Sequence, residues 1–357
     1  MNNTAYLILQ NGNIFSGRRF GAEGDITAEL VFTTAMTGYL ETLTDPSYHG
    51  QMVVQTFPLI GNYGVIPADF ESASPRLSAY IVKEKCNIPS NFRSEGDLDS
   101  YLKASGIIGL EDVDTRTLTK IIREYGVMNA AIVSEIPEDL PKFVAALALK
   151  ELGSDVYQVT CSEPATFNKE GNKHIVLWDF GYKRGMATEL IARGCRVTVV
   201  PAGSTFAEIA AYQPDGILLS NGPGDPAVNT AIIREIRQAM EAEIPVFGIC
   251  LGHQLMALAQ GAQTTKLRYG HRGANQPVRD IRTGHLYITS QNHGYAVETE
   301  SLPETAKLRF ENLNDLTCEG VDYLHTPAFS VQFHPEARGG PLDTTFLFDR
   351  FLAMVEK

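Results

Sequence analysis

From Asn172 onward, the chain alternates short, continuous apolar runs with stretches of amphipathic, helix-like spacing. Continuous apolar runs are typical of parallel strands, because helices cover both faces of a parallel sheet. The predicted strands are 174–178, 195–200, 215–220 and 244–249, and the predicted helices between them are 184–193, 205–213 and 228–242. This alternation predicts an α/β domain built on a doubly wound, mostly parallel sheet.

Shorter apolar segments separated by turns follow this alternation. They lie near 276–282, 286–290, 307–313, 317–323 and 328–333, and a predicted helix from Leu342 to Val355 closes the chain. Because turns rather than helices separate these segments, we expect antiparallel strands at an edge of the parallel sheet or in a small second sheet.

The first half of the chain lacks regular strand–helix–strand spacing. Short predicted strands near 5–9, 27–34 and 51–57 are followed by predicted helices near 114–124 and 138–151. This mixture predicts an α+β domain over residues 1–154. Residues 155–172 contain Pro, Asn and Gly without a helical period, and they predict a linker to the second domain at 173–357.

Charge and composition exclude several classes of function. The 357 residues include 30 Lys and Arg against 42 Asp and Glu, a net charge of −12, which disfavours nucleic-acid or anionic-membrane partners. No apolar run reaches the roughly 18 residues of a membrane helix, and the amino terminus has no basic stretch ahead of an apolar one. We therefore expect a soluble, cytoplasmic protein.

The five cysteines are odd in number, widely scattered and never in a CxxC pair. This distribution disfavours both a disulfide framework and a zinc site, and we expect no bound metal.

The segment PVFGICLGHQLMALAQGA places Cys250 between a buried strand and an amphipathic helix, with Gly248 and Gly252 on either side. Gly-x-Cys-x-Gly is typical of a nucleophile on a tight strand-to-helix turn. The helix amino terminus favours the thiolate, and the Leu251 N–H can receive a developing oxyanion. The alternative is that Cys250 only fills the core; the two glycines and the strand-to-helix setting favour the nucleophile.

A candidate base lies in AFSVQFHPEA, where His334 follows another apolar strand and Glu336 comes two residues later. Residues i and i+2 of an extended chain point to the same side, so the carboxylate can orient and stabilise the imidazole. Cys250, His334 and Glu336 together supply a nucleophile, a base and the group that orients it.

FGICLGHQ, followed 84 residues later by QFHPEA, resembles the class I glutamine amidotransferase family. LLSNGPGDP (218–226) resembles that family's oxyanion loop, and DFGYKRG (179–185) resembles the segment after its first strand. The resemblance implies that the cysteine attacks the side-chain amide of glutamine, releases ammonia and leaves a γ-glutamyl thioester for water to cleave.

The first half narrows the resemblance. Segments 36–64 and 112–126, together with GHRGANQPV (270–278) and SQNHGYAV (290–297), resemble the small-subunit family of carbamoyl-phosphate synthetases. Two departures from the family pattern are Tyr295, where Phe is frequent, and Gly185–Met186, where Asn–Ile is frequent; neither is expected to touch the triad. The residues implied to bind glutamine are Ser47, Gly222, Gly224, Leu251, Gln254, Asn292, Gly294 and Tyr295.

The chain contains neither GxxxxGK[ST] nor GxGxxG, so no cofactor is expected on it. The resemblance implies a larger partner subunit, in a heterodimer or a multiple of it, that holds Mg-ATP. That subunit would make carbamoyl phosphate from bicarbonate, ammonia and two ATP, for arginine and/or pyrimidine synthesis. Two alternatives remain: the amidotransferase subunit of another synthase, such as one making anthranilate or GMP, and a non-catalytic docking subunit.

Overall fold

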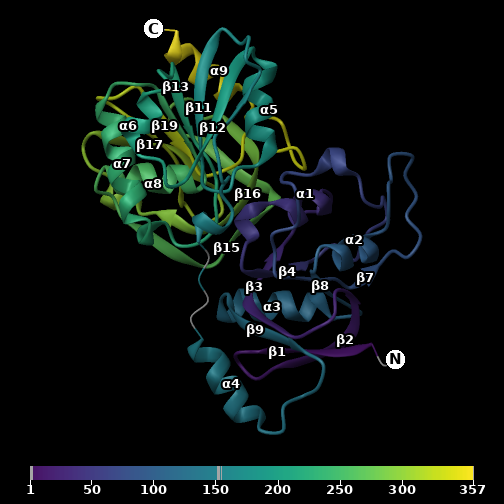
Figure 1. Ribbon diagram of the computed structural model, residues 1–357. Helices are drawn as coiled ribbons and strands as arrows, with labels where there is room; N and C mark the ends of the chain where they lie inside the picture. Colours follow the sequence, from purple (N-terminus) through teal and green to yellow (C-terminus); the bar gives the residue numbers. More distant parts are fainter. Residues whose placement is uncertain (1–2, 151–152, 154, 357) are drawn as a thin grey trace. The chain divides into compact units, whose positions relative to one another are not determined.

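The computed structural model describes residues 3–150, 153 and 155–356 (Figure 1). The chain divides into two compact units, residues 1–154 and 155–357, which are described separately below. Within the described ranges, no helix has the length and apolar character needed to cross a membrane.

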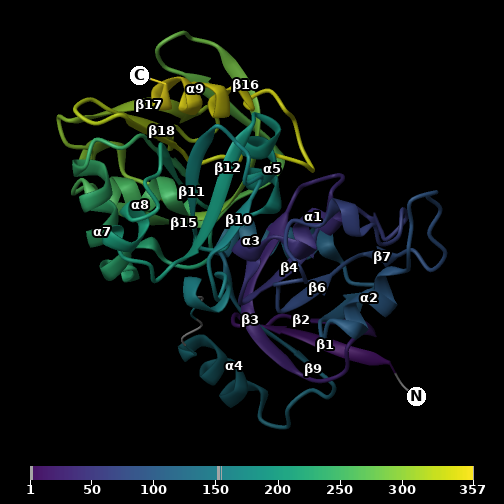
Figure 2. The ribbon, with the colours of Figure 1, turned by 45° about the horizontal axis from the view of Figure 1, so that its top comes forward.

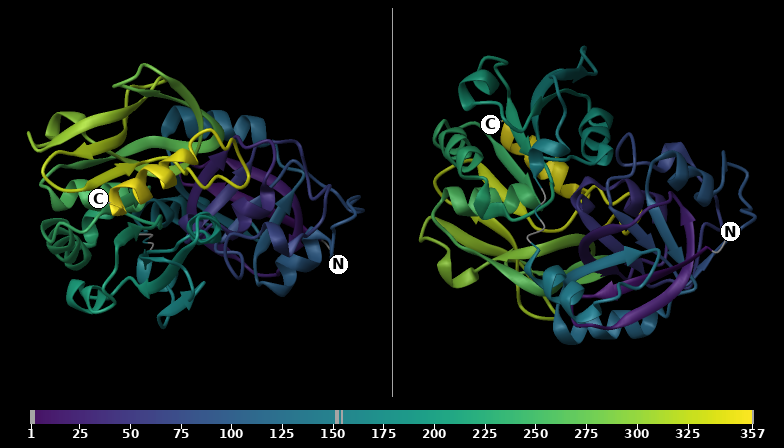
Figure 3. Two further views of the ribbon diagram at one scale, coloured as in Figure 1. Left: turned by 90° about the horizontal axis from the view of Figure 1, so that it is seen from above. Right: turned by 60° about the horizontal axis from the view of Figure 1, so that its bottom comes forward.

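The first unit is a closed barrel of seven strands in the order β1-β2-β8-β6-β4-β3-β9 (Figure 3). The strands are β1 (Thr4–Leu9), β2 (Ile14–Gly21), β3 (Ile26–Thr33), β4 (Gln51–Gln55), β6 (Ala79–Ile81), β8 (Ile108–Glu111) and β9 (Met128–Val133). Strands β3, β4, β6 and β8 pair in parallel, and antiparallel pairing of β1 with β2 and β9 closes the ring. Two short strands, β5 (Leu59–Ile60) and β7 (Glu84–Lys85), form a separate pair.

In the described part of this unit, the α-helices are α1 (Tyr39–Thr44), α2 (Leu98–Ala104), α3 (Thr115–Tyr125) and α4 (Leu140–Leu149). Asp97, Asp114 and Asp139 begin the last three, each accepting a hydrogen bond from a backbone N–H of the first turn. The predicted strands at 5–9, 27–34 and 51–57 are present, but the barrel's closure and the strands β2, β6, β8 and β9 were not predicted. The predicted helix end at 151 lies outside the described residues.

The second unit contains one ten-stranded sheet, in the order β10-β12-β11-β13-β14-β19-β18-β16-β15-β17. Its parallel part comprises β12 (Cys195–Pro201), β11 (Lys173–Asp179), β13 (Gly216–Leu219), β14 (Val246–Ile249) and β19 (Ala328–Val331). Its antiparallel part comprises β10 (Ala165–Phe167), β18 (Cys318–Tyr323), β16 (Leu286–Val297), β15 (Thr264–Asp280) and β17 (Ala306–Asn312). The predicted doubly wound class is confirmed, and the antiparallel strands continue the same sheet.

Helices cover both faces of the parallel strands (Figure 2). Residues of α6 (Phe206–Ala210), α7 (Thr230–Glu241) and α8 (Leu251–Ala259) belong to one core cluster. Residues of α5 (Arg184–Ala192) and α9 (Phe346–Val355) belong to the other. The continuous apolar runs read from the sequence therefore have the expected cause, which is burial on both faces.

Three predictions about this unit need correction. The strand expected at 276–282 begins at Thr264, because the Gly- and Arg-containing segment before it pairs with β16 through two register shifts. The closing helix begins at Phe346 rather than Leu342.

The third correction concerns the predicted linker at 155–172, which belongs to the second unit. Its strand β10 pairs antiparallel with the edge strand β12. The Thr160 hydroxyl donates to the Asp179 carbonyl, and the Cys161 N–H donates to the Asp179 carboxylate. A segment without helical period was therefore ordered by contacts that its own sequence does not reveal.

Candidate active site

Cys250 lies on the turn between β14 and α8, with φ 55° and ψ −103°. A residue with a side chain rarely adopts this conformation, which costs on the order of 1–3 kcal/mol and persists only where surrounding contacts fix it. Here the Cys250 N–H donates to the Val331 carbonyl at 2.9 Å, and the Gly252 N–H donates to the Ser220 carbonyl at 3.0 Å. Adjacent strands thus hold the turn on both sides.

Packing explains the two flanking glycines. A Cβ at Gly248 would lie 2.5 Å from Met256 Sδ, and a Cβ at Gly252 would lie 2.5 Å from the Leu219 carbonyl oxygen. Neither position has room for a side chain. The turn predicted from Gly-x-Cys-x-Gly is therefore present, and its glycines are required by close helix–strand contact.

His334 and Glu336 follow β19 and are almost completely buried. His334 Nδ1 lies 2.7 Å from Glu336 Oε1. Within the part of the chain that the structure describes, His334 Nε2 has no hydrogen-bond partner. The Cys250 side chain raises the pKa of the His334 ring, which places the thiol close to it. Nε2 is therefore available for a contact with the thiol or with a substrate.

Lys183 contacts the predicted triad, and the sequence analysis did not single it out. Its Nζ lies 2.9 Å from Glu336 Oε1, the same oxygen that His334 contacts. The Lys183 N–H also donates to Asn221 Oδ1, which links the loop after β11 to the loop after β13. The only sequence signal was the position of Lys183 within DFGYKRG, a segment to which no role was assigned.

The three buried groups determine one another's charge. Burial and the Lys183 cation lower the pKa of His334, while Glu336 and Cys250 raise it, and the net result is a pKa of about 9. Burial raises the pKa of Glu336. Lys183 and His334 lower it by more than burial raises it, and the net result is a pKa of about 2. Glu336 therefore favours the protonated form of His334, and Lys183 and His334 favour the ionised form of Glu336.

Several residues expected to bind glutamine adjoin the elbow. The Cys250 Sγ lies 3.7 Å from the Asn292 carbonyl oxygen. Gln254 Nε2 donates to the Tyr295 carbonyl at 2.8 Å. A Cβ at Gly222 would lie 2.7 Å from Leu251 Cδ2, so the NGPGDP loop passes directly beside the residue that follows the nucleophile.

For the remaining residues predicted to bind glutamine, the structure gives a position in the fold but no contact with Cys250. Gly224 has φ +88°, a conformation that favours glycine, and Gly294 lies between Asn292 and Tyr295 on β16. Ser47 belongs to the first unit, where it is buried in the short helix Pro46–Tyr48. The role of Ser47 stays a prediction.

One statement about the family departures is wrong. Gly185 was expected not to touch the triad, yet a Cβ at this position would lie 3.0 Å from Glu336 Cγ. Glycine therefore allows α5 to approach the carboxylate closely. Met186, the other residue of this departure, is fully buried in the core.

Comparison with known proteins covers both units. The family described as "Glutamine amidotransferase class-I" matches residues 176–354. The family described as "Carbamoyl-phosphate synthase small chain, CPSase domain" matches residues 7–132.

The chain is similar over nearly its whole length to curated proteins named carbamoyl phosphate synthase small chain. It is 49% identical to the protein of Syntrophotalea carbinolica, covering 99% of this chain and 98% of that one. It is also 49% identical to the protein of Chlorobaculum tepidum, over 99% of this chain and 98% of that one. The identity to the protein of Bacillus caldolyticus is 49% as well, over 98% of this chain and 96% of that one.

We expect Gly252→Ala to destabilise the second unit. Alanine gains up to about 1 kcal/mol of helix propensity, but forcing a methyl group against the Leu219 carbonyl costs about 1–3 kcal/mol. Urea unfolding followed by the fluorescence of Trp178, the single tryptophan, measures the change. Gly203→Ala, where the added Cβ makes only ordinary contact at 3.4 Å, is the control. Equal stability of the two variants would contradict the packing argument.

We expect the pKa of His334 to respond in opposite directions to its two charged neighbours. Lys183→Met removes a cation that lowers this pKa, so the pKa rises above about 9; Glu336→Gln removes the anion, so the pKa falls. Nitrogen-detected NMR titration of ¹⁵N-histidine-labelled protein measures both, with the exposed His285 and His325 as unchanged references. A lower pKa in Lys183→Met would mean that the lysine does not act on the ring through its charge.

Proposed function

Because the chain belongs to the family of carbamoyl phosphate synthase small chains, we propose that Cys250, His334 and Glu336 hydrolyse glutamine and supply ammonia to a separate large chain. The observation that carries this proposal is the strained Cys250 elbow beside a buried histidine whose Nδ1 is held by Glu336. That arrangement leaves Nε2 of the same ring for proton transfer.

The first half of the proposed reaction forms a thioester. The Cys250 thiolate attacks the side-chain amide carbon of glutamine, and the carbonyl oxygen becomes an oxyanion. The Leu251 N–H, at the amino terminus of α8, and the adjoining NGPGDP loop are the donors we assign to this oxyanion. The cationic His334 then protonates the departing nitrogen, the carbon–nitrogen bond breaks, and ammonia leaves.

The second half regenerates the enzyme. Neutral His334 removes a proton from water, and the resulting hydroxide attacks the γ-glutamyl thioester. Collapse of the second tetrahedral intermediate breaks the carbon–sulfur bond, releases glutamate and returns the thiolate beside the imidazolium. Lys183 and Glu336 do not exchange protons in this scheme. Glu336 holds the ring in position and stabilises its charge, and Lys183 holds Glu336.

The glutamine subsite is proposed on the residues that adjoin this centre. Gln254, Asn292, Gly294 and Tyr295 lie on α8 and β16, which a hydrogen bond from Gln254 to the Tyr295 carbonyl connects. Gly222, Gly224 and Leu251 supply backbone groups.

A large chain that holds Mg-ATP is the proposed destination of the ammonia. The relatives are named small chains, which suggests a larger partner for this chain as well. The carbamoyl phosphate made there would feed arginine and/or pyrimidine synthesis, and we propose a cytoplasmic heterodimer or a multiple of it. The match over residues 7–132 favours this function over the amidotransferase subunit of another synthase.

We expect Cys250→Ser to abolish glutamine-dependent synthesis in the complex with the large chain while leaving synthesis from free ammonia intact. Loss of a nucleophile costs on the order of 10³-fold or more. Carbamoyl phosphate formation measured with each nitrogen source checks this result, and Cys195→Ser, a buried cysteine without flanking glycines, is the control. Unchanged glutamine-dependent synthesis in Cys250→Ser would favour a docking subunit without catalysis.

We expect weak glutaminase activity from this chain alone and a higher rate when the large chain, bicarbonate and ATP are present. Displacing an oxyanion donor costs on the order of 10²-fold in rate, so small shifts of the NGPGDP loop suffice for control. Steady-state glutamate release, measured with and without the partner and nucleotide, tests the idea. A lone chain as fast as the working complex would show that the site needs no coupling.

A further inference from the structure

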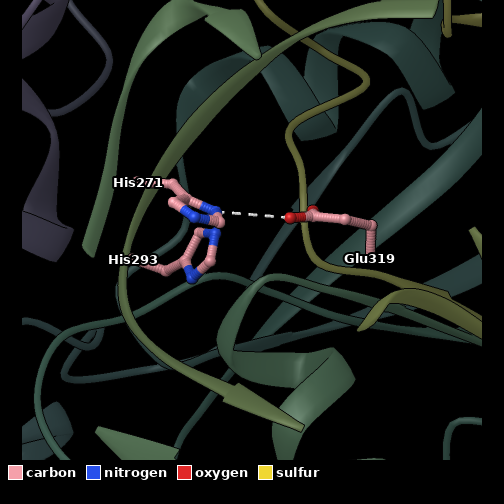
Figure 4. Close-up of side chains that lie close together, drawn as sticks. All are labelled: His271, His293 and Glu319. Atoms are coloured by element: carbon pink, nitrogen blue, oxygen red, sulfur yellow. Dashed lines mark ion pairs between the residues drawn. The ribbon is translucent and has the colours of Figure 1, made fainter. Parts of the chain in front are cut away.

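A second cluster of ionisable side chains lies outside the proposed catalytic residues. His271 on β15 and His293 on β16 are directly opposite each other in the antiparallel pairing, and Glu319 projects toward them from β18 (Figure 4). One ligand atom from each of the three lies within 4.8 Å of the other two. All three side chains are buried.

The outer nitrogen of each histidine is already held by an acceptor. His271 Nε2 lies 2.8 Å from a carboxylate oxygen of Asp315, and His293 Nδ1 lies 2.8 Å from the Tyr295 carbonyl oxygen. Metal-binding histidines are characteristically oriented in this way, with the second ring nitrogen donating to a carboxylate or a backbone carbonyl. Of the inner nitrogens, His271 Nδ1 lies 3.4 Å from Glu319 Oε1 and 3.4 Å from Asn312 Nδ2, and His293 Nε2 lies 3.1 Å from Gln291 Oε1.

The hydrogen bonds around His293 contain a mismatch of polarity. The Thr289 hydroxyl donates to the Gln276 carbonyl, so it can only accept from Gln291 Nε2, which also donates to Glu319. This fixes the amide of Gln291 and directs its Oε1 at His293 Nε2, 3.1 Å away. Because the Tyr295 carbonyl can only accept from Nδ1, a neutral ring directs a lone pair from Nε2 at another lone pair. A cation between these atoms would remove the conflict.

Two of the distances between the ligand atoms match those around a small tetrahedral ion. Zinc binds imidazole nitrogen and carboxylate oxygen at about 2.0–2.2 Å, which separates neighbouring ligand atoms by about 3.4 Å. His271 Nδ1 and Glu319 Oε1 are 3.4 Å apart, and His293 Nε2 and Gln291 Oε1 are 3.1 Å apart. The carboxylates of Glu319 and Asp315 supply two negative charges, equal to the charge of the ion.

We propose that His271 Nδ1, His293 Nε2 and the Glu319 carboxylate bind one Zn²⁺ ion, with Gln291 Oε1 as the fourth ligand. The ion connects β15, β16 and β18 beneath the part of β16 that carries Asn292 and Tyr295. The cysteine pattern gave no sign of this site because the donor set contains no cysteine, and its members come from three different strands.

The test is zinc binding by the full chain, prepared without a polyhistidine tag. Cys250→Ser serves as the background, because the thiol and His334 could otherwise bind the same ion. We expect calorimetry to give one Zn²⁺ per chain, X-ray absorption to show only nitrogen and oxygen ligands, and Zn²⁺ to raise the unfolding temperature reported by Trp178.

Matched variants identify the ligands. Glu319→Gln should lose stoichiometric binding, and Asp315→Asn, which changes only the outer partner of His271, should weaken it about 10- to 100-fold. His285→Gln, at an exposed histidine outside the cluster, should bind as the background does. Asp315 is partly exposed, so its variant keeps the test available if Glu319→Gln fails to fold. Sulfur ligands, absent stoichiometric binding, or equal affinity in Asp315→Asn and His285→Gln would each overturn the proposal.

Discussion

The carboxylate of Glu336 determines the electrostatics of the whole site. It is withdrawn almost entirely from water, and an isolated buried carboxylate would become protonated. Its Oε1 instead contacts both Lys183 and His334, so one anion faces two cations. This shared contact keeps Glu336 in its ionised form and fixes the position of the His334 ring.

The parallel sheet explains why these residues meet. Each residue of the centre follows the carboxyl end of a different strand: Lys183 follows β11, Asn221 β13, Cys250 β14 and His334 β19. These four strands are consecutive in the sheet. Carboxyl ends of parallel strands lie at the same edge, where α/β proteins bind their ligands. Four loops distant in sequence thereby converge on one centre, and the close helix–strand contact at Gly252 fixes the position of the nucleophile within it.

The sequence was most informative where a structural requirement is local. The elbow at Cys250 could be predicted because its glycines lie two residues away, and the pair His334–Glu336 because an extended chain points both to one side. Lys183 could not, since its partner Glu336 lies 153 residues later in the chain and only the fold brings the two together. The closure of the first barrel was equally hidden, because it depends on β1 pairing with β9, more than 100 residues later. The parallel strands, in contrast, could be predicted, because burial on both faces requires a continuous apolar run in each of them.

Residues 155–172 are part of the second unit, so the boundary between the two units lies before them. Their strand β10 covers the outer edge of β12, and Cys161 donates one of the hydrogen bonds that fix the Asp179 carboxylate. That carboxylate also accepts from Gly181 and Tyr182, which places the loop leading to Lys183. A chain shortened to begin at Lys173 would expose an unpaired sheet edge to self-association and loosen the lysine's support. Residues from Asp155 onward therefore belong with the second unit.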